Sequence, residues 1–191
     1  MTLTSQDRQF VDIATADPRI LIDMRYASED NFMKRAVYPM AKCFLRRKVV
    51  QRLSRVQDWL EKRELRLKIL DAYRPLHVQR KLWEILPDDR YVAPPEKGSK
   101  HNRGAAVDIT LADAQGRELV MPTGYDDFTA NAHWSCIDLP LEALANRALL
   151  RKAMEMRGFM TYAFEWWHFD DADWSLYPIE DLAFEELCLS P

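Results

Sequence analysis

Two short stretches of the chain hold ionisable side chains among residues that otherwise have the character of a buried core. Residues 99–108 read SKHNRGAAVD and place His101 seven residues before Asp108. Residues 165–168 read EWWH and place Glu165 three residues before His168. Imidazole and carboxylate groups are ligands suited to zinc. Two histidines and one carboxylate leave a fourth coordination position open for water, as a catalytic zinc site requires.

Both stretches also have a purely structural interpretation. His101 and Asp108 can form a buried hydrogen-bonded pair, and His168 can be satisfied locally within an aromatic core strand. Glu165 and His168 add a geometric condition, because residues three apart in a flat strand point to opposite faces. The two side chains converge only at a strand end, a bulge or a strong twist. From the residues alone, both interpretations stay open.

Three further side chains are candidates for the same site or for its surroundings. Arg74 follows ILDAY at the end of an expected strand. Its guanidinium can stabilise an oxyanion or form an ion pair with an acid such as Asp71. His77 falls on a charged helical segment and is expected to be exposed. His133 lies in an irregular region and is a candidate for a spare ligand.

The hydrophobic pattern predicts the elements that carry these residues. Alternation predicts strands at 19–27, 65–73 and 105–111, and a run of β-branched and aromatic residues predicts another at 159–169. Apolar residues recurring every three or four positions predict helices at 40–64, 76–86 and 140–157, with Gly158 ending the last one. Residues 88–99 and 112–139 are expected to be irregular, with a hairpin turn at Gly116. Because strands and helices do not alternate regularly, we expect an α+β fold with a mostly antiparallel central sheet flanked by helices.

Composition narrows the class of protein. The 191 residues carry a net charge of −3, without the basic patch that marks a nucleic-acid partner. The three cysteines are an odd number and widely spaced, which favours a reducing compartment over a disulfide framework. No segment approaches the ~18 consecutive apolar residues of a membrane span, and the N-terminus lacks the apolar run of a signal peptide. We therefore expect one cytoplasmic domain spanning residues 1–191, with no nucleic-acid or membrane partner.

Whole motifs carry a family resemblance. The patterns are Ser-x-His-x-x-Gly-x-Ala-x-Asp at 99–108 and Glu-x-Trp-His at 165–168, with IDMRYASEDNF (22–32), DAYRP (71–75) and YDDF (125–128) in the same order. In these segments the chain resembles the zinc D-alanyl-D-alanine dipeptidases over residues 20–170. That family shares its fold with D-Ala-D-Ala carboxypeptidases, murein endopeptidases and the hedgehog signalling domain. The resemblance implies the same fold here.

The resemblance also implies roles for individual residues. It implies one Zn²⁺ per subunit, held by His101, Asp108 and His168. Glu165 becomes the general base that activates water and then protonates the leaving amine, and Arg74 becomes the group that binds the developing oxyanion. The implied substrate-binding residues are Tyr26, Ser99 and Asp126, where Asp126, or its neighbour Asp127, pairs with the free ammonium of the substrate.

The implied reaction is hydrolysis of the dipeptide D-alanyl-D-alanine to two D-alanines, which affects the supply or recycling of peptidoglycan precursors. One alternative is a carboxypeptidase or endopeptidase of the same fold that acts on longer wall peptides; the missing signal peptide argues against it. Another is a non-catalytic zinc-binding module, which has no need of Glu165 or Arg74. The expected partner is the small dipeptide, with association into a homo-oligomer as a further option.

Overall fold

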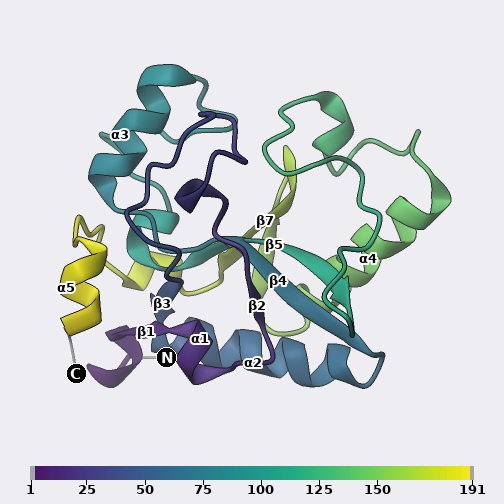
Figure 1. Cartoon of the computed structure of the whole chain (residues 1–191), viewed down its shortest axis with the longest axis horizontal. Coiled ribbons are helices and arrows are strands. Elements are labelled where there is room, and N and C mark those ends of the chain that lie inside the picture. Colours follow the sequence, from purple (N-terminus) through teal and green to yellow (C-terminus); the bar gives the residue numbers. More distant parts are fainter. Residues whose placement is uncertain (1–2, 190–191) are drawn as a thin grey trace.

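The fold is built around a five-stranded sheet with the strand order β2-β4-β5-β7-β6 (Figure 1). The computed structural model describes residues 3–189. Its strands are β1 (Phe10–Asp12), β2 (Leu21–Ile22), β3 (Phe44–Arg46), β4 (Leu65–Asp71), β5 (Ala106–Asp113), β6 (Phe159–Tyr162) and β7 (Glu165–Asp171). Its α-helices are α1 (Ile13–Ala16), α2 (Arg47–Glu61), α3 (Leu76–Ile85), α4 (Leu141–Glu155) and α5 (Phe184–Leu189).

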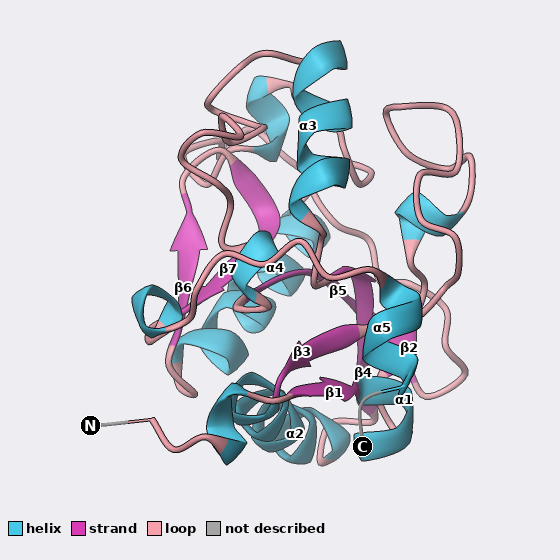
Figure 2. Cartoon of the chain, turned by 90° about the vertical axis from the view of Figure 1, so that its left-hand side faces the viewer, coloured by secondary structure: helices cyan, strands magenta, loops and turns pink. Residues whose placement is uncertain are grey.

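The sheet is mostly antiparallel, as the sequence predicts. Only β2 and β4 run parallel, while the pairs β4–β5, β5–β7 and β6–β7 are antiparallel. A separate two-stranded ribbon pairs β1 with β3. Figures 1 and 2 show α2 along one end of the molecule and α3 at the opposite end, with the loops between strands on the α3 side. The prediction of an α+β fold is confirmed.

Helix α2 supplies much of the core beneath the sheet. Its side chains Val49, Leu53, Val56 and Leu60 are fully buried, and their spacing of three or four residues places them on one helical face. The predicted helix at 40–64 is correct in its interior but wrong at its start. Residues Phe44–Arg46 pair with Phe10–Asp12 instead, which satisfies their backbone groups in a stretch that is buried throughout.

The predicted strand at 19–27 is much shorter in the structure. Only Leu21–Ile22 pairs with β4, and a 3₁₀ turn occupies Arg25–Ala27. The carbonyl of Tyr26 accepts hydrogen bonds from the N–H groups of Val37 and Tyr38. The backbone here is therefore committed to the following loop rather than to the sheet. This bend places Tyr26, which is buried, beside the loops above the sheet.

The predicted strand at 159–169 is in fact a hairpin of β6 and β7. The chain turns at residues 163–164, and the register shifts between Thr161 and Tyr162, so that Tyr162 faces Glu165. Glu165 is thus the first residue of its strand, next to an irregularity. The condition for Glu165 and His168 to converge is met by this strand end.

The central strands align three polar residues across the sheet. In the register of β4 with β5, Asp71 pairs with Asp108; in that of β5 with β7, Asp108 pairs with His168. Both faces of β5 are buried, so these polar groups lie inside the protein. A buried row of this kind is stable only if its members are paired or bind a cation.

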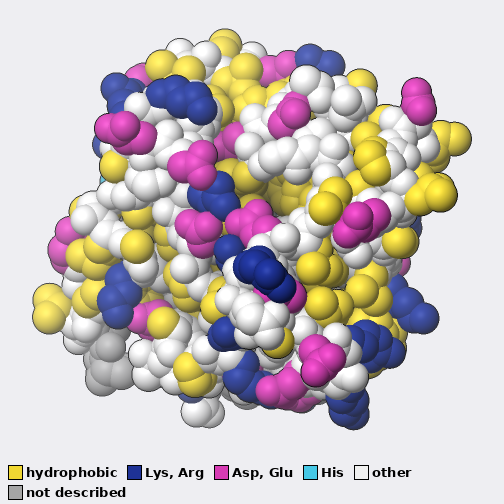
Figure 3. All heavy atoms as spheres, turned by 45° about the vertical axis from the view of Figure 1, so that its right-hand side comes forward, with side chains coloured by type: hydrophobic (Ala, Val, Ile, Leu, Met, Phe, Trp, Pro, Cys, Tyr) yellow, Lys and Arg dark blue, Asp and Glu magenta, His cyan; other side chains and the backbone are white. Residues whose placement is uncertain are grey.

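Among residues 3–189, no helix combines the length and apolar character needed to cross a membrane. On the face drawn in Figure 3, Lys and Arg side chains are interspersed with Asp and Glu.

Steric crowding explains why the first motif has a glycine at position 104. Gly104 ends the 3₁₀ turn His101–Arg103 with φ 64°, in the left-handed region. A Cβ atom at this position would lie 2.3 Å from Cε1 of Phe10. The turn that carries His101 therefore needs a residue without a side chain.

We predict that Gly104→Ala lowers the free energy of unfolding by at least about 1 kcal/mol, since it adds left-handed backbone strain to a steric clash. Urea denaturation measures this change. Gly124→Ala is the control, because nothing lies within 4 Å of its Cβ position; its effect should be close to zero. Equal effects of the two substitutions would show that the turn tolerates a side chain.

Candidate active site

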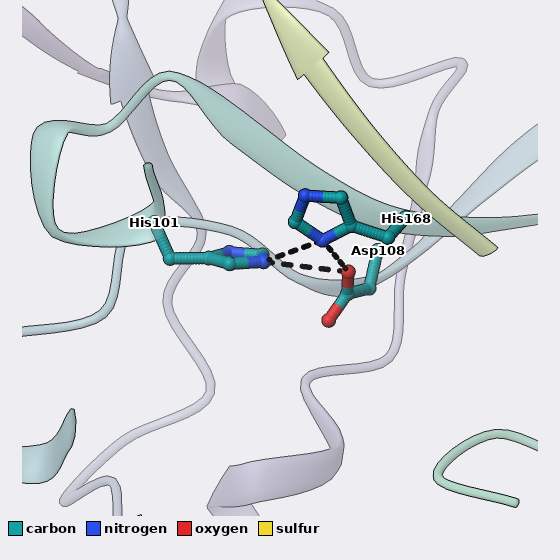
Figure 4. A group of neighbouring side chains, drawn as sticks. All are labelled: His101, Asp108 and His168. Atoms are coloured by element: carbon teal, nitrogen blue, oxygen red, sulfur yellow. Dashed lines mark hydrogen bonds and ion pairs between the residues drawn. The ribbon is translucent and has the colours of Figure 1, made fainter. Parts of the chain in front are cut away.

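Three side chains from three segments converge on one point (Figure 4). His101 comes from the 3₁₀ turn before β5, Asp108 from β5 and His168 from β7. Nε2 of His101 lies 3.2 Å from Nδ1 of His168 and 3.3 Å from Oδ1 of Asp108. Nδ1 of His168 lies 3.0 Å from the same Oδ1. All three residues are buried.

The outer nitrogens of the two imidazoles decide what faces this point. Nδ1 of His101 lies 2.7 Å from the carbonyl oxygen of Ala72, which can only accept, so this nitrogen carries the hydrogen. Nε2 of His168 donates in the same way to Oδ1 of Asp170, at 2.9 Å. In the neutral imidazoles, the inner nitrogens therefore present lone pairs toward each other and toward a carboxylate oxygen. Three converging acceptors call for a cation between them.

The size of the triangle fits zinc. Zinc bound at about 2.0–2.1 Å to nitrogen and oxygen ligands in a tetrahedron separates those ligands by roughly 3.3 Å. The three distances of 3.0–3.3 Å match this edge. Two imidazoles and one carboxylate are also ligands that zinc prefers. The donor set, its geometry and its outer hydrogen bonds all fit the metal that the sequence predicts.

Asp108 is held ionised and oriented by its neighbours. Burial acts to raise the pKa of this carboxyl. Positive charge on the imidazoles of His101 and His168, when a proton takes the place of a metal ion on an inner nitrogen, outweighs burial and holds the pKa well below its usual range. Its second oxygen, Oδ2, accepts a hydrogen bond from the hydroxyl of Tyr125 at 2.8 Å. This leaves Oδ1 directed at the two histidines.

Glu165 lies beside the ligands without joining them. Its Oε2 atom is 3.8 Å from Nδ1 of His168, and within residues 3–189 no hydrogen bond to its carboxylate is found. The side chain is only 8% exposed, and burial raises the pKa of Glu165 well above its usual value. A carboxylate placed in this way can accept a proton and later return it, as a general base must.

Arg74 forms the ion pair that the sequence left open, yet it retains free donors. Its Nη2 lies 2.6 Å from Oδ2 of Asp71, and its Nη1 donates to Oε1 of Gln79 at 2.9 Å. The guanidinium has five N–H groups, so each terminal nitrogen keeps one hydrogen for another acceptor. Nη2 lies 4.0 Å from Oδ2 of Asp108. Asp71 thus fixes the guanidinium next to the ligand triangle.

A cavity of about 160 Å³ opens in front of these residues. It is much smaller than the ~300–1,000 Å³ typical of pockets for drug-sized ligands. The sequence-predicted residues that line it are Tyr26, Arg74, Ser99, His101, Asp108, Asp126, Glu165 and His168. The structure therefore brings together every residue that the resemblance implies for the site.

Asp126 is held in an unusual backbone conformation. Its φ is 58°, one of three positive values among non-glycine residues 3–189. Its Oδ2 accepts a hydrogen bond from the N–H of Phe32 at 3.1 Å, and its Oδ1 accepts one from the hydroxyl of Tyr26 at 3.3 Å. Burial raises the pKa of Asp126 to about 7. Strain that is retained beside a cavity is typical of a functional position.

The remaining candidates lie elsewhere. Asp127 accepts a hydrogen bond from the N–H of Thr129 and is not among the cavity residues. His133 contacts the hydroxyl of Tyr91 through Nε2 at 3.0 Å, away from the ligand triangle. His77 is half-exposed and pairs with Asp181, in agreement with the expectation of exposure.

Several positioning residues were not found from the sequence. Asp170 supports His168, and Tyr125 supports Asp108. Asn102 accepts from the N–H of Ser99 and donates to the carbonyl of Arg74, which joins the two motif segments. The two-residue period of a strand places His168 and Asp170 on one face, and this signal was available in the sequence.

Comparison with known proteins gives a consistent result. The profile of the family Peptidase_M15, described as D-ala-D-ala dipeptidase, matches residues 6–185. The D-alanyl-D-alanine dipeptidase of Escherichia coli K12 is 36% identical over 175 residues, which cover 92% of this chain and 91% of that protein. The enzyme of the same name from Streptomyces coelicolor is 32% identical over 174 residues, with coverage of 77% and 83%. A crystal structure of a variant of the vancomycin-resistance D,D-pentapeptidase VanY with Zn(II) aligns at a TM-score of 0.46 and 16% identity, covering 88% of this chain and 97% of that one.

The contact between His168 and Asp170 predicts an effect on metal affinity. Oδ2 of Asp170 is also paired with Nζ of Lys100 at 3.3 Å, which fixes the carboxylate. We predict that Asp170→Ala weakens Zn²⁺ binding 10–100-fold, the usual cost of losing such a partner. Asp170→Asn should lose less, because an amide oxygen can still accept from Nε2. Competition with a chromophoric chelator measures both.

Asp171→Asn is the matched control for this prediction. Asp171 is the next residue and equally buried, but it pairs with Arg52 on α2. Its substitution should lower the melting temperature and leave metal affinity within about threefold of the parent protein. Metal affinity unchanged in Asp170→Ala would show that His168 needs no carboxylate behind it.

Proposed function

This chain belongs to the D-Ala-D-Ala dipeptidase family of M15 metallopeptidases, and from that premise we propose how its residues carry out the reaction. The activity is hydrolysis of D-alanyl-D-alanine: water adds across the peptide bond, with the hydroxyl going to the carbonyl carbon and a proton to the leaving nitrogen. The products are two molecules of D-alanine.

One observation carries the proposal most directly. Three lone-pair donors converge in a triangle of 3.0–3.3 Å, and a carboxylate that ligates nothing lies 3.8 Å from one of them. A structural metal site needs the triangle but has no use for Glu165. A hydrolytic site needs both. His101, Asp108 and His168 would hold one Zn²⁺, which would supply a Lewis acid for the carbonyl and make water easier to deprotonate.

Glu165 is the proposed general base. Its carboxylate takes a proton from the attacking water and passes it to the nitrogen of the departing D-alanine. Burial supports this role, because the raised pKa of Glu165 brings it closer to the pH at which the enzyme works. The strand end at residue 165 lets the side chain reach the same point as His168.

Arg74 is the proposed oxyanion-binding group. Its position is fixed by Asp71 and Gln79 before any substrate arrives. The two remaining N–H donors can therefore meet negative charge on the carbonyl oxygen without reorganisation. Since that charge develops only near the transition state, Arg74 contributes mainly to kcat.

Recognition of the substrate's free ammonium accounts for part of the preference for a dipeptide. We propose that Asp126, supported by the hydroxyl of Tyr26, pairs with the free ammonium, and that Ser99 helps to hold the substrate backbone. A peptide extended at its N-terminus replaces this ammonium with an amide, which cannot form an ion pair with the carboxylate of Asp126. The small cavity adds a steric limit.

The proposal extends to the whole chain. Residues 1–191 are proposed to form one zinc dipeptidase domain, because a single hydrophobic core runs from Leu3 to Leu187 and the family profile covers most of the sequence. Its activity would deplete or recycle the dipeptide that enters peptidoglycan precursors.

The proposed function is tested by zinc-reconstituted hydrolysis of three compounds: D-Ala-D-Ala, L-Ala-L-Ala and N-acetyl-D-Ala-D-Ala. We expect rapid cleavage of the free D,D-dipeptide alone, followed by release of D-alanine. Cleavage of the acetylated compound would assign a carboxypeptidase instead. No cleavage of any of them would leave a zinc-binding module.

We predict that Glu165→Gln keeps the fold and the zinc but loses at least ~10³-fold in kcat, since the amide cannot take a proton from water. Steady-state kinetics and metal content measure the two properties separately. Glu155→Gln on α4 is the control, because Glu155 lies on the surface, where it pairs with Arg151; this variant should retain full activity. Activity retained in Glu165→Gln would contradict the proposed mechanism.

The raised pKa of Asp126 predicts a pH dependence of kcat/KM. Below about 7 this carboxyl is protonated in the free protein and cannot pair with an ammonium, so kcat/KM rises as pH increases through about 7. The substrate amine loses its proton near pH ~8, so kcat/KM falls again. In Asp126→Asn we expect a raised KM and loss of the part of the acid limb that Asp126 contributes. An unchanged pH profile of kcat/KM in Asp126→Asn would show that Asp126 does not bind the ammonium.

A further inference from the structure

Two phenylalanine side chains, Phe32 and Phe128, line the same cavity as Asp126, the proposed ammonium site. The backbone N–H of Phe32 donates to Oδ2 of Asp126 at 3.1 Å, and Phe128 follows Asp126 by two residues. The rings of Phe32 and Phe128 meet edge to face, with their centroids 5.3 Å apart. Both line the cavity and both are half-buried. The segments 22–38 and 121–134 thus meet at this ring pair.

Neighbouring aromatic residues hold the pair in place. The ring of Tyr91 lies 4.8 Å from that of Phe128, and the ring of Tyr26 lies 6.2 Å from that of Phe32. Tyr91 is itself fixed by the contact of its hydroxyl with His133. Rings packed on both sides move little. The pair therefore forms a stiff wall of the cavity rather than a flexible cover.

The position of this wall determines which part of a substrate it meets. In a dipeptide, the ammonium and the side chain of the first residue are bonded to the same carbon. If Asp126 holds the ammonium, that side chain must lie among the groups that surround Asp126. We propose that Phe32 and Phe128 limit the N-terminal residue of the substrate to a methyl-sized side chain. This inference rests on the proposed function.

The size of the effect follows from hydrophobic pockets in general. One methylene more or less in such a pocket changes kcat/KM about 10–200-fold. A side chain larger than methyl has to displace a ring that is packed on its far side, so the wall discriminates by exclusion. With the ammonium on Asp126, the second residue of the dipeptide lies beyond the scissile bond, so we expect these rings to affect its side chain less.

Phe128→Ala tests the inference with substrates enlarged at one end at a time. The ratio of kcat/KM for D-Ala-D-Ala to that for D-Leu-D-Ala should fall at least 10-fold relative to the parent enzyme. The ratio of D-Ala-D-Ala to D-Ala-D-Leu should change less than about threefold. An unchanged first ratio, or an equal fall in both ratios, would overturn the proposal.

Phe164→Ala is the matched control. Phe164 belongs to the same aromatic group, with its ring 6.3 Å from that of Tyr91, but it is not among the cavity residues. If loosening of the aromatic group alone widened the substrate specificity, Phe164→Ala would widen it equally. That result would contradict the proposed role of Phe32 and Phe128. We expect it to leave both ratios unchanged.

A more conservative substitution keeps the proposal testable if Phe128→Ala is too unstable to assay. If Phe128→Ala melts below the assay temperature, Phe128→Leu takes its place because it removes less volume. It should shift the first ratio in the same direction by a smaller factor. An unchanged first ratio in Phe128→Leu would contradict the proposal. Failure of the proposed function has a different signature, because the parent enzyme would then not cleave D-Ala-D-Ala.

Discussion

Repulsion among three buried acceptors is the constraint on which the rest of this site depends. Two imidazole lone pairs and a carboxylate oxygen meet within hydrogen-bond distance, with the ring hydrogens committed to Ala72 and Asp170 on the far sides. Without a metal ion, or a proton on one of the inner nitrogens, this arrangement is unfavourable in a low-dielectric interior. The sheet register that pairs Asp108 with His168 holds the three groups together against that repulsion. The stability of the fold thus keeps the site ready for a metal.

The carboxylates around the ligand triangle fall into two groups, those paired with a cationic side chain and those that are not. Asp71 and Asp170 are paired, with Arg74 and with His168 and Lys100 respectively, and they fix other side chains. Within residues 3–189, Glu165 and Asp126 have no cationic partner at such short range, and burial raises the pKa of each. In the proposed mechanism, the paired acids position other side chains, whereas the unpaired acids transfer a proton or bind the substrate. This separation lets several carboxylates share a small cavity without having the same chemistry.

The sequence identifies the chemistry of this protein better than its backbone. Residues such as His101, Asp108 and Glu165 stand out because ionisable groups among apolar residues are costly, and a resemblance of motifs connects them. The predicted secondary structure was wrong where strand pairing between distant segments overrides the local sequence pattern. Phe44–Arg46 continues the helical period of α2 yet pairs with β1, and the apolar run 159–169 hides the turn at 163–164. Phe32 and Phe128 were not singled out, because only the packing of distant loops shows that they share a wall.

The order in which the ligands occur along the chain has a consequence for biosynthesis. His101 and His168 are 67 residues apart, and Asp108 and His168 are 60 apart. Contacts of such high sequence separation form late in folding, after much of the loop-closure entropy has been lost. Because synthesis proceeds from the N-terminus, a nascent chain that still lacks β7 has only two of the three ligands. The ligand set is therefore complete only after β7 has been synthesised, and a chain truncated before β7 lacks His168 as well as Glu165.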